Sequence, residues 1–197
     1  MKKEPINLPN IRIITVSGRI ASGSTTLGHK LANILGWRHI EGGEVFWESV
    51  RTKMGLDEKD TDKRPDKEDE DFDASLRRIL ENGKDIILET KLAGFNAQGI
   101  EGVFKVAVVC EDENGQDKTD IRIDRLINRE KISIDQAKEE VIEREKNDLE
   151  KWRRLYANGD PNWNYWDKKY YDLTINTYSH NQDETLKLAL EKIGYEG

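Results

Sequence analysis

Residues 11–35 read IRIITVSGRIASGSTTLGHKLANIL, and this stretch decides the expected fold. It starts with a short β-branched run of the kind that is buried in parallel sheets, made of Ile11, Ile13, Ile14 and Val16. It ends with apolar residues at the spacing of one helical face, namely Leu27, Leu31, Ile34 and Leu35. The stretch therefore predicts a buried strand, a glycine-bounded loop and an amphipathic helix, in that order.

The loop between strand and helix has the spacing of a phosphate-binding loop, G-x-x-x-x-G-K-[S/T], except that Ser24 stands at the lysine position. The glycines let successive backbone N–H groups point at one place, and the helix that begins at about Thr25 directs its positive dipole end there. A glycine turn without a ligand is the alternative, and the motif alone does not decide between the two. The candidate ATP-binding residues are Gly18, Arg19, Ile20, Ala21, Ser22, Gly23, Ser24, Thr25 and Thr26.

A magnesium site is expected beside this loop, formed by Thr25 and Glu89. Thr25 has the position from which a hydroxyl ligates the magnesium of a bound nucleotide. Glu89 ends a predicted strand over residues 85–90, and ligands of open parallel sheets bind beyond the carboxyl ends of the strands. A carboxylate there can hold Mg²⁺ directly or through water. The alternative for Glu89 is an ion pair at the edge of the core with Lys91 or a nearby arginine.

Composition narrows the class of protein. The chain has 197 residues, a formal net charge of −7 and a pI near 5.2, which argues against a general nucleic-acid binder. Its single cysteine, Cys110, is expected to be a buried apolar residue at a strand end, in a reducing compartment. Because no apolar run approaches about 18 residues and the N-terminus lacks an apolar signal core, we expect a cytoplasmic protein without membrane partners, as a monomer or weak homo-oligomer.

The rest of the chain alternates between strand and helix patterns. Further strands are predicted near residues 36–40, 85–90, 104–109 and 171–176, and further helices near 44–54, 72–82, 133–156 and 186–193. The charged stretch 56–71 is predicted to be a loop or disordered segment, since Pro65 excludes a continuous helix. This order predicts an α/β fold with a doubly wound parallel sheet of five strands and inserted helices over its carboxyl edge.

Arginines cluster on two of the predicted helices. Arg122, Arg125 and Arg129 follow one another at i, i+3 and i+7, on one helical face. A capping box at residues 133–136 opens the next helix, which carries Arg144. Charged helices commonly solvate themselves through i,i+4 pairs, and that alternative stays open for any single arginine. A shared stripe beside a second basic helix favours a lid that faces phosphates.

From about Ile11 to Ile193 the chain resembles the archaeal-type cytidylate kinases, within the nucleoside monophosphate kinases. The matching stretches, in order, are VSGRIASGSTT, HIEGGEVF, ILETKLAGF, RIDRLINRE, SIDQAKEEVIERE and YDLTINT. The resemblance implies one P-loop kinase domain over residues 1–197, with an acceptor-binding insertion at about 41–84 and a lid at about 117–165. It also implies transfer of the ATP γ-phosphoryl group to a pyrimidine nucleoside monophosphate, CMP or dCMP, with Mg²⁺.

The resemblance further implies roles for single residues. Four arginines match the arginine-rich lid region that closes on the phosphates: Arg122, Arg125, Arg129 and Arg144. The last three of these form the expected catalytic set together with Lys91. Asp73 falls in the segment that recognises the acceptor. The chain departs from the family pattern at Trp47, where arginine is usual.

A second departure lies at Lys91, which stands where the family usually has arginine. A lysine holds phosphate as a point charge and lacks the planar bidentate contact. Arg51, one helical turn after Trp47, can partly substitute, so Trp47, Arg51, Asp73 and Lys91 are the candidate acceptor-binding residues. Two alternatives remain open: a kinase for a different small acceptor, or a nucleotide-binding protein with little or no turnover.

Overall fold

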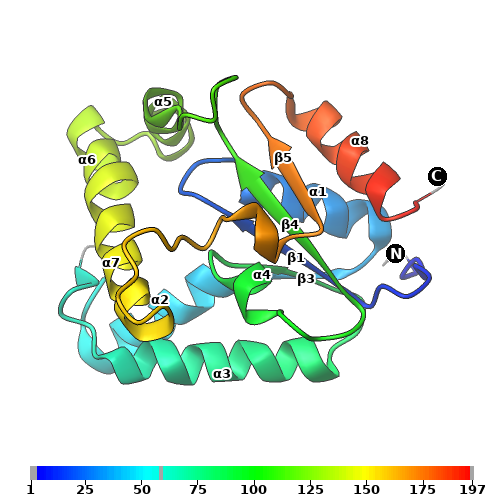
Figure 1. The fold of residues 1–197 in the computed structure, drawn as a ribbon, viewed down its shortest axis with the longest axis horizontal. Coiled ribbons are helices and arrows are strands. Elements are labelled where there is room, and N and C mark those ends of the chain that lie inside the picture. The colour runs from blue at the N-terminus through cyan, green and yellow to red at the C-terminus, as the bar shows by residue number, and fades with distance from the viewer. Residues whose placement is uncertain (1–3, 58–59, 196–197) are drawn as a thin grey trace.

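The computed structural model describes residues 4–57 and 60–195 and shows a five-stranded sheet in the order β2-β3-β1-β4-β5 (Figure 1). Every strand pairing is parallel, so the carboxyl ends of the strands share one edge. The strands are β1 (Ile13–Gly18), β2 (Arg38–Glu41), β3 (Ile86–Glu89), β4 (Val103–Val109) and β5 (Leu173–Asn176). The predicted doubly wound parallel sheet is confirmed.

Two apolar cores cover the two faces of the sheet, because neighbouring residues of a strand point to opposite sides. Ile14 belongs to the core beneath α1 (Ser24–Leu35) and α8 (Gln182–Lys192), whereas Ile13 belongs to the core beneath α3 (Asp66–Asn82) and α4 (Ala93–Asn96). Figure 1 shows α8 beside α1 on the right of the sheet and α3 along its lower side. The predicted burial of Cys110 at the end of β4 is also confirmed.

The remaining helices gather toward the carboxyl edge of the sheet (Figure 1). They are α2 (Gly42–Met54), α5 (Thr119–Glu130), α6 (Ile134–Lys138) and α7 (Glu145–Tyr156), with a short 3₁₀ helix at Lys168–Tyr170. The predicted capping box of Ser133 and Gln136 opens α6. A π-helical segment, Glu139–Arg144, joins α6 to α7, so the single long helix expected from the sequence is interrupted by one wider turn.

The prediction of a loop through residue 71 was wrong in its second half, because α3 begins at Asp66. Pro65 precedes the helix as its N-cap residue, where the missing N–H costs nothing. Acidic residues of the first turn, including Asp69, suit the positive end of the helix dipole, and Lys67 pairs with Asp71 one turn later. The composition of residues 56–71 suggested disorder. In α3, however, the charged residues pair with one another or face the helix dipole, and these interactions depend on their positions along the helix.

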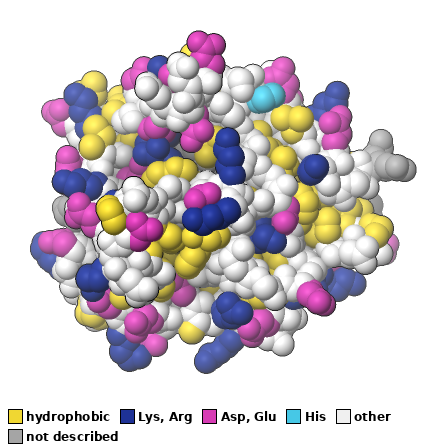
Figure 2. Space-filling model, in the orientation of Figure 1, with side chains coloured by type: hydrophobic (Ala, Val, Ile, Leu, Met, Phe, Trp, Pro, Cys, Tyr) yellow, Lys and Arg dark blue, Asp and Glu magenta, His cyan; other side chains and the backbone are white. Residues whose placement is uncertain are grey.

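Charges of both signs are interspersed on the surface, as one face of the molecule shows (Figure 2). Within residues 4–57 and 60–195, no helix combines the length and the apolar character that crossing a bilayer requires.

Candidate active site

The phosphate loop leads from β1 into α1 and needs glycine at both ends. A Cβ on Gly18 would lie 2.4 Å from the Ser22 hydroxyl oxygen, so a side chain does not fit there. Gly23 has a φ of 111°, in the left-handed region that favours glycine, and it is the N-cap residue of α1. The amide of Ser22 donates to the Arg19 carbonyl oxygen at 3.0 Å and closes the turn. The loop thus has the shape that the motif predicts.

Ser24 and Thr25 both donate to one carboxylate oxygen. Their hydroxyl oxygens each lie 3.0 Å from Glu89 Oε1, so β3 and the start of α1 meet at this point. Burial raises the pKa of Glu89 above its ordinary value, and the two hydroxyl hydrogen bonds oppose that shift. A threonine hydroxyl beside a carboxylate offers hard oxygen ligands, which fit Mg²⁺. The alternative pair of Glu89 with Lys91 does not form, because Lys91 pairs elsewhere.

A buried network of four charges holds the outer part of the loop. Arg19 pairs with Glu145 of α7 and, at 3.0 Å, with Asp117. Arg122 contacts the same two carboxylates at 3.0 and 2.8 Å and is almost fully buried. Glu145 also accepts the Ile20 amide at 3.3 Å. Arg122 therefore ties the loop to α5 and α7, and it is not among the described residues that line the open cleft.

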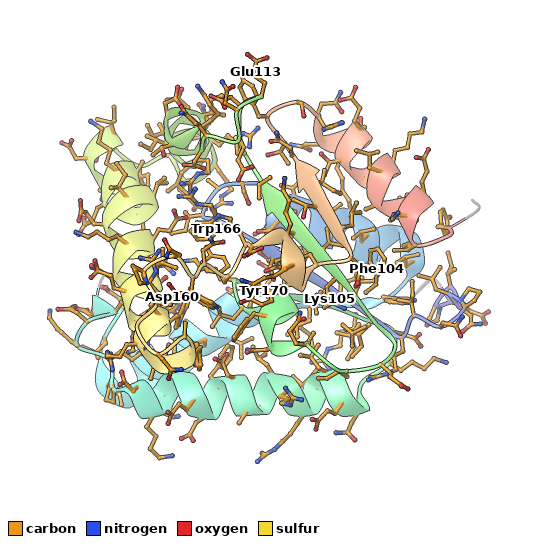
Figure 3. The ribbon with its side chains drawn as sticks, in the orientation of Figure 1. Phe104, Lys105, Glu113, Asp160, Trp166 and Tyr170 are labelled. Atoms are coloured by element: carbon orange, nitrogen blue, oxygen red, sulfur yellow. The ribbon has the colours of Figure 1, made fainter. Side chains whose placement is uncertain are left out.

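Trp166 covers this network from outside. Its ring lies 4.5 Å from the Arg19 guanidinium carbon, a cation–π contact. Figure 3 shows Trp166 on the segment that follows α7, between that helix and the sheet.

The other two arginines of α5 lie beside the loop. Arg125 donates to the Thr177 hydroxyl and carbonyl oxygens at 2.8 Å each, which ties α5 to the end of β5. Arg129 is half-exposed, pairs with the neighbouring Glu130, and lines the cleft. The structure thus brings Arg125 and Arg129 to the loop on the face predicted from their spacing.

Two cavities meet at the phosphate loop. One, of about 510 Å³, runs from the loop toward the opposite wall, which includes Trp47, Arg51, Lys91 and Arg144. The other, of about 750 Å³, lies on the far side of the loop and is lined by residues that include Arg125, Thr177, Tyr178, His180 and Thr185. Both cavities share Ala21, Gly23 and Arg129, so the loop forms the junction between them.

A third, smaller cavity of about 90 Å³, called here the aromatic cavity, continues from the opposite wall and is lined by four aromatic side chains together with charged ones. Trp47 is buried between two guanidinium groups, 4.6 Å from Arg64 and 5.7 Å from Arg144. Tryptophan supplies no cation here, but its ring positions two. Arg64 grips Asp69 at 3.0 and 2.7 Å, while its remaining terminal nitrogen is buried without a hydrogen-bond partner in the structure. Phe46, Phe72 and Trp152 complete the walls.

Lys91 is committed to a carboxylate in this structure. Its Nζ lies 2.6 Å from Asp148 Oδ2, and Thr61 donates to the other oxygen at 3.0 Å. Burial lowers the pKa of Lys91, whereas Lys91 and Arg144 together hold the pKa of Asp148 below its ordinary value against the effect of burial. Asp148 thus places a negative group between two cations, Lys91 and Arg144.

Asp73 joins three helices at the rim of the aromatic cavity. It accepts a hydrogen bond from Asn96 at 2.8 Å and another from the Tyr156 hydroxyl. Burial raises the pKa of Asp73 to about 6, although both hydrogen bonds oppose this. The carboxyl group is therefore partly protonated in mildly acidic solution.

Comparison with known proteins identifies the family of this chain. The chain is 32% identical over 188 residues to the cytidylate kinase of Methanopyrus kandleri, covering 92% of this chain and 94% of the relative. It is 32% identical over 168 residues to that of Natronomonas pharaonis, covering 84% and 80%. The chain belongs to the cytidylate kinase family. It is therefore a nucleoside monophosphate kinase, although no protein-family model matches it.

Comparison with solved structures agrees on the fold of this chain. Shikimate kinase from Acinetobacter baumannii matches with a TM-score of 0.55 at 15% identity, covering 94% of this chain and 95% of that one. A gluconokinase from Sinorhizobium meliloti matches with a TM-score of 0.55 at 14% identity, covering 95% and 93%. At these identities the likenesses show a shared fold of the sheet and its helices.

Sequence reasoning missed several residues of the cytidylate kinase cleft. Arg64 and Asp69 lie in the charged stretch that composition assigned to a loop. Asp148 stands one turn after Arg144 on the predicted helix over residues 133–156. This spacing indicates a pair between these two residues, but it does not indicate the pair of Asp148 with Lys91, which follows β3. Trp152 lies within the predicted helix over residues 133–156, and its apolar spacing there does not indicate a cavity. These residues meet through tertiary contacts, which periodicity along the chain does not report.

Proposed function

We propose that this protein transfers the γ-phosphoryl group of ATP to CMP or dCMP in a Mg²⁺-dependent reaction. The observation that carries the proposal is the continuous cleft between the phosphate loop and the wall of Trp47, Lys91 and Arg144. A donor held by the loop and an acceptor held by that wall would face one another across this space. The names of the curated relatives supply the acceptor class.

The donor side is the phosphate loop and the larger cavity behind it. Backbone N–H groups of residues 19–26 bind the phosphates, and the cavity that contains Arg125 and His180 receives the nucleoside part. Thr25 and Glu89 are the candidate ligands of Mg²⁺, which neutralises phosphate charge when bound. Ser24 keeps Glu89 oriented through its hydroxyl hydrogen bond.

The acceptor side is the insertion of about residues 41–84 together with the end of β3. Lys91, Arg144 and Arg51 surround the place of the acceptor phosphate, and Asp148 leaves when that phosphate arrives. The aromatic cavity beyond receives the base. Asp73 and the unpartnered nitrogen of Arg64 offer hydrogen bonds at its edge.

Catalysis in this proposal is positioning and electrostatic stabilisation, without a covalent intermediate. The lid of about residues 117–165 brings Arg129 and Arg144 to the cleft, where their charge offsets the charge on the transferred group. The buried network of Arg19 and Glu145 ties the lid to the loop and helps to exclude water.

The test is incubation of the protein with ATP, Mg²⁺ and each of CMP, dCMP, UMP, AMP and GMP, followed by chromatography of the products. We expect CDP or dCDP, and none when EDTA removes the metal. If ADP forms only with a non-nucleotide acceptor, the acceptor assignment is wrong. If calorimetry shows tight ATP binding while no acceptor is phosphorylated at high enzyme concentration, the protein is a nucleotide-binding protein instead.

A kinase for another small acceptor is the second candidate, and Trp47 is the observation that favours it. An aromatic ring on the acceptor wall lowers the number of cations that can meet a phosphate. A panel of hydroxyl-bearing acceptors without a phosphate, monitored by ADP release, distinguishes the two candidates.

A further inference from the structure

Two histidines and a glutamate meet outside the proposed catalytic set. His29 lies on the exposed side of α1, and His39 and Glu41 lie on β2. His29 Nε2 is 3.1 Å from Glu41 Oε1, and His39 Nδ1 is 3.6 Å from the same oxygen. The two imidazole rings meet edge to face with centroids 4.4 Å apart. All three ligand atoms lie within 4.8 Å of one another.

The contacts within this cluster leave His39 without a hydrogen bond. Its Nδ1 is too far from Glu41 for one, and its Nε2 is buried and unpartnered in the structure. The Nε2 atom faces the backbone of Gly28, where an added Cβ would lie 2.7 Å away, so Nδ1 is the nitrogen that can ligate an ion beside Glu41. Burial and the neighbouring His29 both lower the pKa of His39, which favours the neutral form that ligates metals.

We propose that His29, His39 and Glu41 bind one divalent metal ion of the Zn²⁺ class. Ligand atoms around a tetrahedral Zn²⁺ are roughly 3.3 Å apart for bonds of about 2.0–2.1 Å, close to the two distances seen here. Two imidazoles with one carboxylate suit Zn²⁺ or a similar transition metal and not Mg²⁺, which prefers oxygen ligands. The side chain of His29 is 55% exposed, so the ion keeps an open position toward solvent.

This site is distinct from the magnesium site in its ligands, although the two are neighbours. Glu41 is in register with Glu89 across β2 and β3, and Glu41 is also the N-cap residue of α2. A bound ion would tether α1, which begins at the phosphate loop, to the start of α2, which carries Trp47 and Arg51. The ion would therefore join the donor and acceptor walls of the cleft, which Glu41 itself lines.

The first test is calorimetric titration of the full chain with ZnCl₂, without nucleotide and with excess MgCl₂ to occupy oxygen-ligand sites. We expect one Zn²⁺ per chain. His29→Gln and Glu41→Gln should each weaken binding at least tenfold, whereas the matched control His180→Gln should bind as the unchanged protein does. His29 is half-exposed, so its replacement is compatible with folding, which circular dichroism verifies.

A second measurement locates the ion without any substitution. In protein labelled with ¹⁵N-histidine, Zn²⁺ should shift the ring nitrogens of His29 and His39 and leave those of His180 unchanged. The proposal is overturned if Zn²⁺ fails to bind at one per chain, if His29→Gln binds it as tightly as the unchanged protein, or if the His180 signals move instead. These readouts do not depend on phosphoryl transfer, so they stay separate from the proposed function.

Discussion

Among single residues, Ser24 changes how the phosphate loop is built. Lysine at this position would bring a cation to the donor phosphates. Serine instead places a second hydroxyl on Glu89, so that Ser24 and Thr25 hold the same oxygen. In the proposed function, the positive field at the loop comes from the amides at the start of α1 and from Arg125, Arg129 and Arg144.

Glu89→Gln should abolish most of the proposed magnesium-dependent turnover. We expect kcat to fall by about 100-fold or more, the cost typical of losing one group that stabilises transition-state charge. Because burial raises the pKa of Glu89, the neutral amide should not destabilise the fold. The measurement is ADP production under saturating ATP and CMP, together with thermal unfolding.

The matched control is Glu81→Gln on the exposed surface of α3, where Glu81 pairs with Arg77. It should leave kcat unchanged. A Glu89→Gln enzyme that keeps a third of the normal kcat would contradict the assignment of Glu89 to the metal.

Asp148→Asn should separate stability from acceptor binding. Breaking one partner of a buried ion pair costs about 3–5 kcal/mol of unfolding free energy, because Lys91 loses its counter-charge. The same change frees Lys91 and Arg144 for the acceptor phosphate, so KM for CMP should fall several-fold. Urea unfolding and initial rates measure the two effects. A loss of stability with an unchanged or higher KM would show that Asp148 does not occupy the phosphate position.

At the scale of elements, Asp73 couples α3 to α4 and α7 through Asn96 and Tyr156. Its pKa near 6 in the folded protein exceeds that of an unfolded aspartate. Between about pH 4 and pH 6 the folded chain therefore holds a proton that the unfolded chain has lost. The contribution of this group to stability falls as pH rises through that window, by at most about 3 kcal/mol.

Asp73→Asn should remove this dependence. The free energy of unfolding of the unchanged protein should drop more between pH 4 and pH 7 than that of the variant, as urea titrations at several pH values would show. Asp71→Asn, on the exposed side of the same helix, is the control and should keep the normal slope. Identical slopes for Asp73→Asn and the unchanged protein would place the raised pKa elsewhere.

Elements that the sequence predicts well are those with local causes. The strand, loop and helix of residues 11–35 follow one another along the chain, so their pattern and glycine spacing predict the strand, the helix and the tight turn between them. The start of α3 escaped prediction because its charges are satisfied by partners such as Arg64, which lies outside the helix. The π-helical segment escaped because a wider turn leaves no mark on apolar spacing.

At the scale of the whole molecule, local sequence patterns do not predict how the proposed acceptor wall is assembled. Trp47, Arg64, Lys91 and Asp148 come from four separate segments and meet only in the folded chain. Family resemblance predicted that cations would gather there and that Trp47 and Lys91 departed from the pattern. It did not predict that the Trp47 ring contacts two arginines or that Asp148 pairs with Lys91.

A bisubstrate analogue that links adenosine to cytidine through phosphates should stabilise the whole chain more than either nucleotide alone at the same concentration. At about 100 times its Kd a ligand adds about 2.7 kcal/mol, which corresponds to a rise in Tm of about 5–10 °C for a protein of this size. Thermal unfolding with Mg²⁺ and with EDTA measures the rise and its metal dependence. An analogue no better than ATP would mean that the acceptor wall is not engaged.

The π-helical segment Glu139–Arg144 changes the direction in which the side chains of α7 face relative to those of α6. In an uninterrupted α-helix, Ala137 and Val141 would face the same way as Glu145 and Trp152. The wider turn offsets the second pair by roughly 100°, the rotation of one residue. The first pair therefore packs toward α5. Of the second pair, Glu145 contacts Arg19 of the loop, and Trp152 packs in a cluster with Trp163 and Tyr165. Residues that share one helical spacing in the sequence therefore pack against two different parts of the protein. Deleting a single residue from this turn would rotate Glu145 away from Arg19.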